Sequence, residues 1–260
     1  HDEAVAYIVK TGFQRDDYRP FLFKTEDFGE TWRSITGDLP EGTVHVIVED
    51  RKNPALLFVG KEFGVWVTID GGQRWVKMTG NMPTQDVFDL LIHPRENDLV
   101  VGTYGRGIYV TDISPLQELS YEMLEKDVHL FEIEPRIQWR YRPRGRIFGH
   151  RQFRAPNEPN GMMVHYYLKN NLPEDVKVMI TDPYGKQAAR LKGPGRAGIH
   201  RIVWDMRQQP PEEESREEAG IRRSRRGRGE FVEPGEYVVI LEAGGKRLQQ
   251  RAVIRPMPLH

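Results

Sequence analysis

The feature that most constrains the fold of this chain is a repeat with a period of 43 residues. The segment Thr25-Glu26-Asp27-Phe28-Gly29-Glu30-Thr31-Trp32 returns as Thr68-Ile69-Asp70-Gly71-Gly72-Gln73-Arg74-Trp75, and Leu39-Pro40 returns as Met82-Pro83. A fixed period in the 40s, combined with strand-rich units, is typical of a β-propeller blade. Because a single blade cannot bury both of its faces, the period predicts a larger closed assembly of which this chain supplies one part.

The copies of the repeat differ in completeness. The second copy contains four strand-like segments, at residues 44–48, 56–59, 65–68 and 74–78, which is one full blade. The first copy has no innermost strand, and the third stops after Thr111-Asp112-Ile113 without a glycine or tryptophan, so it lacks an outer strand. Residues 1–113 are therefore predicted to form an incomplete propeller of fewer than three full blades.

The remaining sequence changes character twice. Residues 114–155 are predicted to be a connector with a possible short helix. Residues 156–257 contain about six short alternating strands bounded by turn residues, which is typical of an Ig-like or fibronectin-type β-sandwich. A run of glutamates followed by arginines interrupts this pattern at 208–230 and predicts a solvated charged loop, with a docking arm for a charged partner as the alternative. The expected fold class is all-β.

Composition removes several function classes. The 38 basic and 38 acidic side chains balance, so the charge gives no reason to expect a nucleic-acid partner. No apolar run is long enough for a transmembrane span. Cysteine is absent, which excludes disulfides, thiolate metal sites and a cysteine nucleophile. The chain begins inside a strand-like run without a methionine, and we therefore expect it to be the end of a longer polypeptide.

The repeated motif Ser/Thr-x-Asp-x-Gly-x-x-Trp is known as an Asp-box, and its chemistry is structural. The aspartate can accept backbone N–H groups across its own tight hairpin, glycine suits a positive φ, and the tryptophan ring is expected to be buried between neighbouring blades. Asp27 and Asp70 occupy equivalent places on different blades, too far apart for the roughly 5–10 Å of a glycosidase carboxylate pair. The structural Asp-box residues are Asp27, Gly29, Trp32, Asp70, Gly72 and Trp75.

Binding sites of propellers usually lie at the end opposite the Asp-boxes, in the turns between second and third strands. Here those turns are residues 12–19, 61–64 and 103–107. They predict a rim that binds sugar or peptide, although salt bridges and caps on a polar rim would give the same composition. The histidines are too scattered for a metal site, and no catalytic or cofactor motif is present. The predicted rim residues are Arg15, Asp16, Asp17, Tyr18, Glu62, Tyr104 and Arg106.

These residues carry a family resemblance. Residues 1–120, through the Asp-boxes, Ile92-His93-Pro94-Arg95 and Gly105-Arg106-Gly107-Ile108, resemble the C-terminal part of large bacterial Asp-box (BNR) repeat proteins, often labelled sortilin-like or glycosyl-hydrolase-like. Residues 160–257, through Asp182-Pro183-Tyr184-Gly185-Lys186 and Pro234-Gly235-Glu236-Tyr237, are similar to the Ig-like domain that ends these proteins. The resemblance implies a secreted, periplasmic or cell-surface bacterial protein. Its glycosyl-hydrolase label rests on fold analogy.

Three functions follow as hypotheses. The first is a non-catalytic binding or scaffold module that recognises a protein or a glycan through the propeller rim. The second is the C-terminal part of a sialidase-like or xyloglucanase-like glycoside hydrolase whose catalytic residues lie largely upstream. The third is a subunit of a larger envelope assembly. Under each, the missing blades come from upstream sequence or from another chain, and no cofactor is expected.

Overall fold

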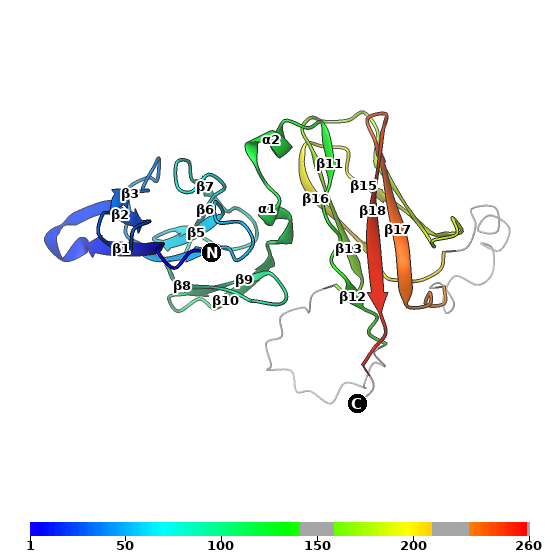
Figure 1. The fold of residues 1–260 in the computed structure, drawn as a ribbon, viewed down its shortest axis with the longest axis horizontal. Coiled ribbons are helices and arrows are strands. Elements are labelled where there is room, and N and C mark those ends of the chain that lie inside the picture. Colours follow the sequence, from blue (N-terminus) through cyan, green and yellow to red (C-terminus); the bar gives the residue numbers. More distant parts are fainter. Residues whose placement is uncertain (141–158, 210–228, 259–260) are drawn as a thin grey trace. The chain divides into compact units, whose positions relative to one another are not determined.

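The structure of the protein is a computed structural model that describes residues 1–140, 159–209 and 229–258 (Figure 1). The chain divides into two compact units, His1–Met123 and Leu124–His260. Both units are built mainly from antiparallel strands. Most of the charged loop predicted at 208–230, and part of the connector predicted at 114–155, lie outside the described residues.

The first unit consists of three small antiparallel sheets, consistent with a partial propeller. We call them blades 1, 2 and 3. Blade 1 comprises β1 (Ala6–Gly12), the 3-10 helix η1 (Phe13–Arg15), β2 (Asp17–Thr25) and β3 (Arg33–Ser34). Blade 2 comprises β4 (Val44–Glu49), β5 (Leu57–Lys61), β6 (Gly64–Thr68) and β7 (Val76–Lys77). Blade 3 comprises β8 (Val87–Ile92), β9 (Asp98–Thr103) and β10 (Ile108–Asp112). As predicted, only the second of these described sheets has four strands.

The central blade is buried on both faces. Every residue of β5 is buried. Leu57 and Val59 belong to the core shared with blade 1, whereas Phe58 points the other way into the core shared with blade 3. This alternation follows from the two-residue period of a strand, in which successive side chains point to opposite faces of the sheet. Stacking of neighbouring blades therefore supplies the cores of this unit.

The contact between blades 1 and 2 is centred on Trp75. Its ring is 4% exposed, its indole Nε1 donates to the Ile35 carbonyl at 3.1 Å, and its backbone N–H donates to Asp38 Oδ1 at 2.7 Å. Gly37 lets the two backbones approach, since a Cβ there would lie 2.5 Å from the Gln73 carbonyl oxygen. We call residues 36–40, which together with the Ile35 carbonyl receive this tryptophan, the tryptophan socket.

Trp32 behaves differently from its equivalent, and here the expectation of a buried ring is wrong. Trp32 is 39% exposed, and its Nε1 donates to the Gly29 carbonyl of its own turn at 3.1 Å. The reason is positional. Trp75 reaches back to the socket of the preceding blade, whereas the described chain has no sheet before blade 1 that Trp32 could reach.

A short helical segment follows blade 3, at α1 (Ser114–Gln117) and α2 (Tyr121–Leu124). Gln117 fastens α1 to two turns of the unit: its Nε2 donates to Asp50 Oδ1 at 2.8 Å and to Asn97 Oδ1 at 3.2 Å. Asn53 Nδ2 in turn donates to the Gln117 carbonyl at 3.2 Å. No helix among the described residues is long and apolar enough to cross a membrane.

The second unit is formed by two sheets that share one hydrophobic core. The first sheet has the order β11-β13-β16, and the second has the order β12-β18-β17-β14-β15. The pairing is antiparallel except between β12 and β18. The strands of the first sheet are β11 (Val128–Leu130), β13 (Met162–Leu168) and β16 (Gly198–Trp204). Those of the second are β12 (Arg136–Ile137), β14 (Val176–Thr181), β15 (Gln187–Gly193), β17 (Gly235–Ala243) and β18 (Lys246–Arg255).

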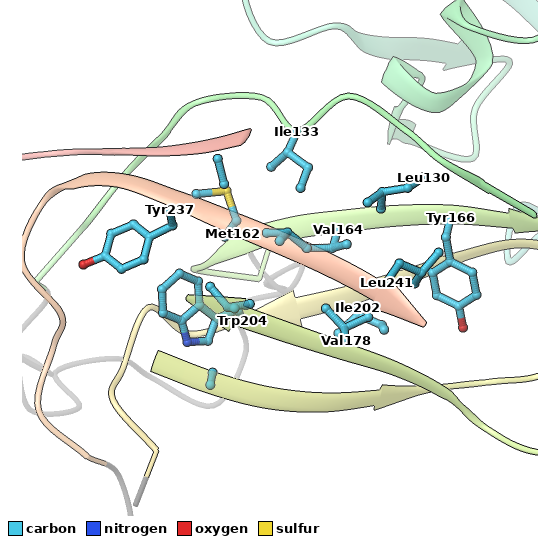
Figure 2. Close-up of a cluster of buried hydrophobic side chains, with 14 of the residues drawn as sticks. Leu130, Ile133, Met162, Val164, Tyr166, Val178, Ile202, Trp204, Tyr237 and Leu241 are labelled. Atoms are coloured by element: carbon cyan, nitrogen blue, oxygen red, sulfur yellow. The ribbon is translucent and has the colours of Figure 1, made fainter. Parts of the chain in front are cut away.

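Large side chains from both sheets interdigitate in this core (Figure 2). Met162, Val164 and Tyr166 of β13 alternate inward, as the period of a strand requires. Trp204 meets Tyr237 edge to face with 5.4 Å between ring centroids. The two polar atoms of the largest rings are paired, since Trp204 Nε1 donates to the Arg207 carbonyl and the Tyr166 hydroxyl donates to the Pro194 carbonyl. The core is thus filled without stranding the polar atoms of these rings.

The blade contact gives the first prediction. Trp75→Ala should destabilise the first unit by about 3–5 kcal/mol, the usual cost of removing a buried aromatic side chain from a packed core. The matched change Trp32→Ala should cost much less, because that ring is half exposed to solvent. Hydrogen exchange of β4 and β5 amides in increasing urea measures both. Equal losses for the two variants would contradict the assignment of Trp75 to the blade contact.

Candidate functional site

Because neighbouring strands in each blade are antiparallel, the turns that join them lie at two opposite ends of the sheets. The turns between second and third strands, at residues 12–17, 61–64 and 103–108, lie at the same end as the starts of β4 and β8. Backbone hydrogen bonds join these segments. Gly42 N donates to the Tyr18 carbonyl at 2.9 Å, Glu62 N to the Thr43 carbonyl at 3.1 Å, and Tyr104 N to the Asp86 carbonyl at 3.0 Å. We call this end of the first unit the rim, and the Asp-boxes lie at the other end.

The predicted rim residues of blade 1 lie in and after η1. Arg15 is exposed, and Asp16 closes η1 in a left-handed conformation with φ 57°. Asp17 forms an ion pair with Arg19 at 2.7 Å, and hydrogen bonds from Arg19 lower the pKa of this carboxyl to about 2. Asp17 is therefore held within its own strand. The Tyr18 ring remains free to contact a ligand, at 49% exposure.

In blade 2, Lys61 and Glu62 support the rim. Lys61 is almost fully buried and its Nζ donates to the Pro40 carbonyl at 2.5 Å and to the Glu41 carbonyl at 3.2 Å. Burial lowers the pKa of this ammonium group. Glu62 Oε2 accepts the Thr43 backbone N–H at 3.3 Å. Both side chains therefore fix the segment that leads into β4.

Phe63, which was not among the predicted rim residues, lies between Glu62 and the start of β6. Its ring is 60% exposed, and its backbone is left-handed with φ 71°. A bulky side chain in that conformation is strained, because its Cβ crowds the backbone. Phe28 of the first Asp-box is also exposed and left-handed, with φ 58°. Phe63 is therefore a candidate contact residue because of its place at the rim, and its strained backbone is a secondary argument. The signal was present in the Glu62-Phe63-Gly64 turn, where a glycine would have been the unstrained choice.

A second missed cluster lies at the rim between blades 2 and 3. His45 stacks on Phe88 with 4.3 Å between ring centroids and 13° between ring planes, and His45 Nε2 lies 2.9 Å from Asp86 Oδ1. Phe88 meets Tyr104 at 5.6 Å, and Tyr104 is 74% exposed. Phe88 is the repeat equivalent of His45, 43 residues later, but the period alone does not show that equivalent rings of neighbouring blades touch.

The seven predicted rim residues are thus distributed over three turns. Tyr18 and Glu62 are close through Gly42, whose Cβ would lie 3.3 Å from Glu62 Oε2. Tyr104 joins the aromatic cluster of Phe88, and Arg106 is an exposed residue of the blade 3 turn. Within the described residues, no side-chain hydrogen bond links any two of the seven. Each blade has an exposed aromatic side chain at this end: Phe13 in η1 and Tyr18 at the start of β2 in blade 1, Phe63 in the turn of blade 2, and Tyr104 in the turn of blade 3.

The first Asp-box satisfies its own carboxylate. Asp27 Oδ1 accepts the Thr31 backbone N–H at 2.9 Å and the Thr25 hydroxyl at 2.7 Å, while Asp27 Oδ2 accepts the Thr31 hydroxyl at 2.5 Å. These hydrogen bonds, led by that of the Thr31 side chain, lower the pKa of Asp27 to about 2. Gly29 adopts φ 91°, as the motif predicts.

In the second Asp-box, one of the hydrogen-bond donors to the aspartate comes from outside the motif. Asp70 Oδ1 accepts the backbone N–H groups of Gln73 and Arg74 at 2.9 and 3.0 Å, and Gly72 adopts φ 97°. Arg74 stands where the first box has Thr31, so the second hydroxyl donor is missing from the motif. The Tyr121 hydroxyl at the start of α2 takes its place and donates to Asp70 Oδ2 at 2.7 Å. Burial alone would raise the pKa of Asp70, but these hydrogen bonds lower it.

The carboxylates of the described residues have structural environments. Where their pKa values depart clearly from the ordinary range, at Asp17, Glu26, Asp27, Asp70 and Asp127, all are lowered by hydrogen bonds. A catalytic acid of a glycosidase requires the opposite shift. In the same part of the chain, no group of three or more histidine, aspartate and glutamate side chains is placed to hold a metal ion.

Comparison with known proteins gives matches in structure only. No protein-family model matches the chain, and no curated protein matches it. One similar structure is PorZ, a bacterial surface component of the type-IX secretion system of Porphyromonas gingivalis, with 16% identity, a TM-score of 0.28, and coverage of 87% of this chain and 24% of that one. Another is YCF48 bound to D1 peptide, with 14% identity, a TM-score of 0.26, and coverage of 66% and 48%.

A third similar structure is an ancestral GH74 enzyme, with 13% identity and a TM-score of 0.26, covering 73% of this chain and 27% of that one. These are structural matches to β-propeller proteins at low identity. The chain spans less than half the length of each of the three.

The Asp27 environment predicts an acid-dependent contribution to stability. The carboxyl has a pKa of about 2 in the folded protein and an ordinary value of 3.8. Its contribution is therefore present in full above the ordinary value and is lost as the pH falls through the folded value. Thr31→Val should raise the folded pKa, because the Thr31 hydroxyl is its largest cause. NMR titration of the Asp27 side-chain carbon checks this, and an unchanged midpoint in the variant would refute it.

The Tyr121 hydrogen bond gives a separate prediction. Tyr121→Phe should raise the pKa of Asp70 and speed hydrogen exchange of the α2 amides, because the only lost group is the hydroxyl that donates to Asp70. The titration of Asp27 serves as the internal control and should not move. If α2 exchanged as slowly as in the wild type, the proposed attachment of α2 to the second Asp-box would be wrong.

Proposed function

We propose that the first unit is a non-catalytic binding module that recognises a protein or a glycan through the rim. The observation that carries this proposal is the presence of exposed aromatic rings at the rim end of every blade: Tyr18 at the start of β2, and Phe63 and Tyr104 in the turns of blades 2 and 3. Aromatic residues are enriched where proteins contact partners, although a single exposed ring is common on any surface. The recurrence of such rings at the same end of all three blades is what supports a contact surface there.

The setting of these rings supports the proposal. Each turn is fixed by a backbone hydrogen bond to the neighbouring segment, so the rings are presented by rigid elements. Rings of this kind stack on the apolar faces of sugars or pack against apolar side chains of a peptide. Asp86 and His45 lie beside Phe88 and provide polar atoms that can hydrogen-bond to hydroxyl or amide groups.

The non-catalytic part of the proposal is supported by the carboxylates. Those of the Asp-boxes are saturated by hydrogen bonds from their own turns and from Tyr121, and their pKa values are lowered. A carboxylate in that state stays ionised at neutral pH and cannot protonate a leaving group. The Asp-box carboxylates therefore do not supply the acid that the glycoside hydrolase alternative requires.

We propose further that the second unit is an Ig-like domain with a scaffold role. Ig domains often contain a tyrosine near the start of a strand whose hydroxyl bonds back to the backbone a few residues upstream. Tyr237, near the start of β17, does this: its hydroxyl donates to the Glu233 carbonyl at 2.7 Å. Trp204 packs against the same ring. On the resemblance of residues 1–120 and 160–257, we propose a secreted, periplasmic or cell-surface location.

Phe63 provides the sharpest test of the rim. Phe63→Gly should raise the stability of the first unit by about 1 kcal/mol, because glycine adopts a left-handed backbone without the steric cost of a Cβ. The same change should weaken ligand binding roughly tenfold, the loss expected for one aromatic contact residue. A residue with a purely structural role would not show this opposite movement of stability and affinity.

The ligand must first be found by screening the protein on glycan and peptide arrays, with affinity then measured by calorimetry. Tyr104→Ala should also lower affinity. Phe28→Ala is the matched control, because Phe28 is an equally exposed ring in the first Asp-box, away from the rim, and should leave affinity unchanged. Retained affinity in both rim variants would contradict the proposal, and turnover of an array glycan would favour the hydrolase alternative.

A further inference from the structure

The outer surface of blade 1 repeats a surface that is already occupied elsewhere in the chain. In blade 2, Val59 pairs with Trp66 across β5 and β6, and both side chains pack with Trp75 into the core shared with blade 1. In blade 1, Ile8 pairs with Phe23 at the equivalent place in β1 and β2. Adding Trp32, the equivalent of Trp75, completes a set of three matched residues, which we call the docking face of blade 1: Ile8, Phe23 and Trp32.

The two surfaces differ in exposure although their residue types match. Val59 is fully buried, whereas its equivalent Ile8 is 45% exposed. Trp75 is buried, whereas Trp32 is not. Large apolar side chains at matched positions favour burial in both blades. The contrast therefore comes from the sheet that blade 2 has in front of it, namely blade 1, and that blade 1 does not have within the described chain.

The contact between Trp75 and blade 1 shows which groups a partner of the docking face must supply. Trp75 needs a carbonyl oxygen for its Nε1, supplied by Ile35, and a side-chain oxygen for its backbone N–H, supplied by Asp38. A glycine between them, Gly37, is needed because a Cβ would clash with the backbone of the Asp-box turn. The same elements recur one period later in Thr79-Gly80-Asn81-Met82-Pro83.

We propose that the docking face of blade 1 binds a preceding propeller blade whose outer strand ends in a tryptophan socket of this kind, Thr-Gly-Asp or Thr-Gly-Asn followed by an apolar residue and proline. Trp32 Nε1 would donate to the backbone carbonyl before the threonine, and Trp32 N to the aspartate or asparagine side chain. The proposal concerns the opposite side of blade 1 from its contact with blade 2 and does not depend on the ligand of the rim.

A second copy of this chain does not offer such a socket. Blade 3 is the other terminal sheet of the first unit, and in the described chain it has three strands and no segment equivalent to residues 36–40. After Thr111-Asp112-Ile113 the chain enters α1. The socket-like segment of blade 2, residues 79–83, lies on the side where blade 3 already packs. The occupant is therefore a blade with its own outer strand.

The chain itself supplies a test partner. A second copy of residues 44–92 placed directly before His1 provides a complete blade 2, its socket at residues 79–83, and the inner strand β8. The linker from the inserted β8 to β1 has the natural length, because five residues separate β8 from β9 and five residues precede β1. Labelling with 5-fluorotryptophan gives one fluorine resonance per tryptophan, and the shift between H2O and D2O reports exposure of each ring.

In this extended protein the Trp32 resonance should lose its solvent shift and resemble that of the original Trp75. The original Trp75 resonance also serves as the control that blade 2 of the original chain is folded. Gly80→Val in the inserted copy should restore the exposure of Trp32, because it fills the socket. The matched control is Gly80→Val at its original position, where a Cβ meets no atom within 4 Å, and it should change nothing.

Two results would overturn the proposal. In the first, Trp32 stays exposed in the extended protein. This would count against the proposal if the inserted strands are protected from hydrogen exchange, because the folded blade would then not have docked. It would count equally if they are unprotected, because the docking face is expected to stabilise the inserted blade. In the second, the 260-residue chain alone protects Trp32 at high concentration and Trp32→Ala abolishes the association. A second copy would then be the occupant.

Discussion

The first unit depends on a carboxylate that is satisfied inside its own turn. In each Asp-box the aspartate accepts backbone and hydroxyl hydrogen bonds from residues within four positions, so the hairpin between third and fourth strands has one shape. That fixed shape aims the tryptophan at the preceding sheet. Trp75 then reaches Ile35 and Asp38, and the blades stack around it. Local hydrogen bonding thus sets a long-range contact.

Stacking of blades also explains how the two ends of the strands acquire different roles. The Asp-box end is saturated: its aspartates are paired, Tyr121 completes the second box, and Gln117 ties α1 to the neighbouring turns. The rim end is held mainly by backbone hydrogen bonds, which leaves its side chains free to face solvent. Tyr18, Phe63 and Tyr104 are exposed at this end for that reason. We therefore propose the rim, and not the repeated acidic turns, as the binding end of this unit.

Several site residues could be found from the sequence and others could not. The period located the Asp-boxes and the three turns between second and third strands; Glu62 and Tyr104 lie in those turns, whereas Tyr18 lies at the start of β2. The period did not reveal that Glu62 accepts a backbone hydrogen bond rather than facing a ligand, or that Phe63 is strained and exposed. It also did not show that His45 stacks on Phe88, since that contact joins two blades and depends on how far each inner strand extends.

The sequence by itself determined the repeat, the blade strands, the positive φ of the box glycines and the alternation of β13 and β14, because these follow from local backbone chemistry and a two-residue side-chain period. Only the tertiary structure decided which copies of a motif are buried. Trp32 and Trp75 have the same motif around them, yet one ring is enclosed and the other is open. Burial belongs to the pair of surfaces that meet, and a sequence motif describes only one of them.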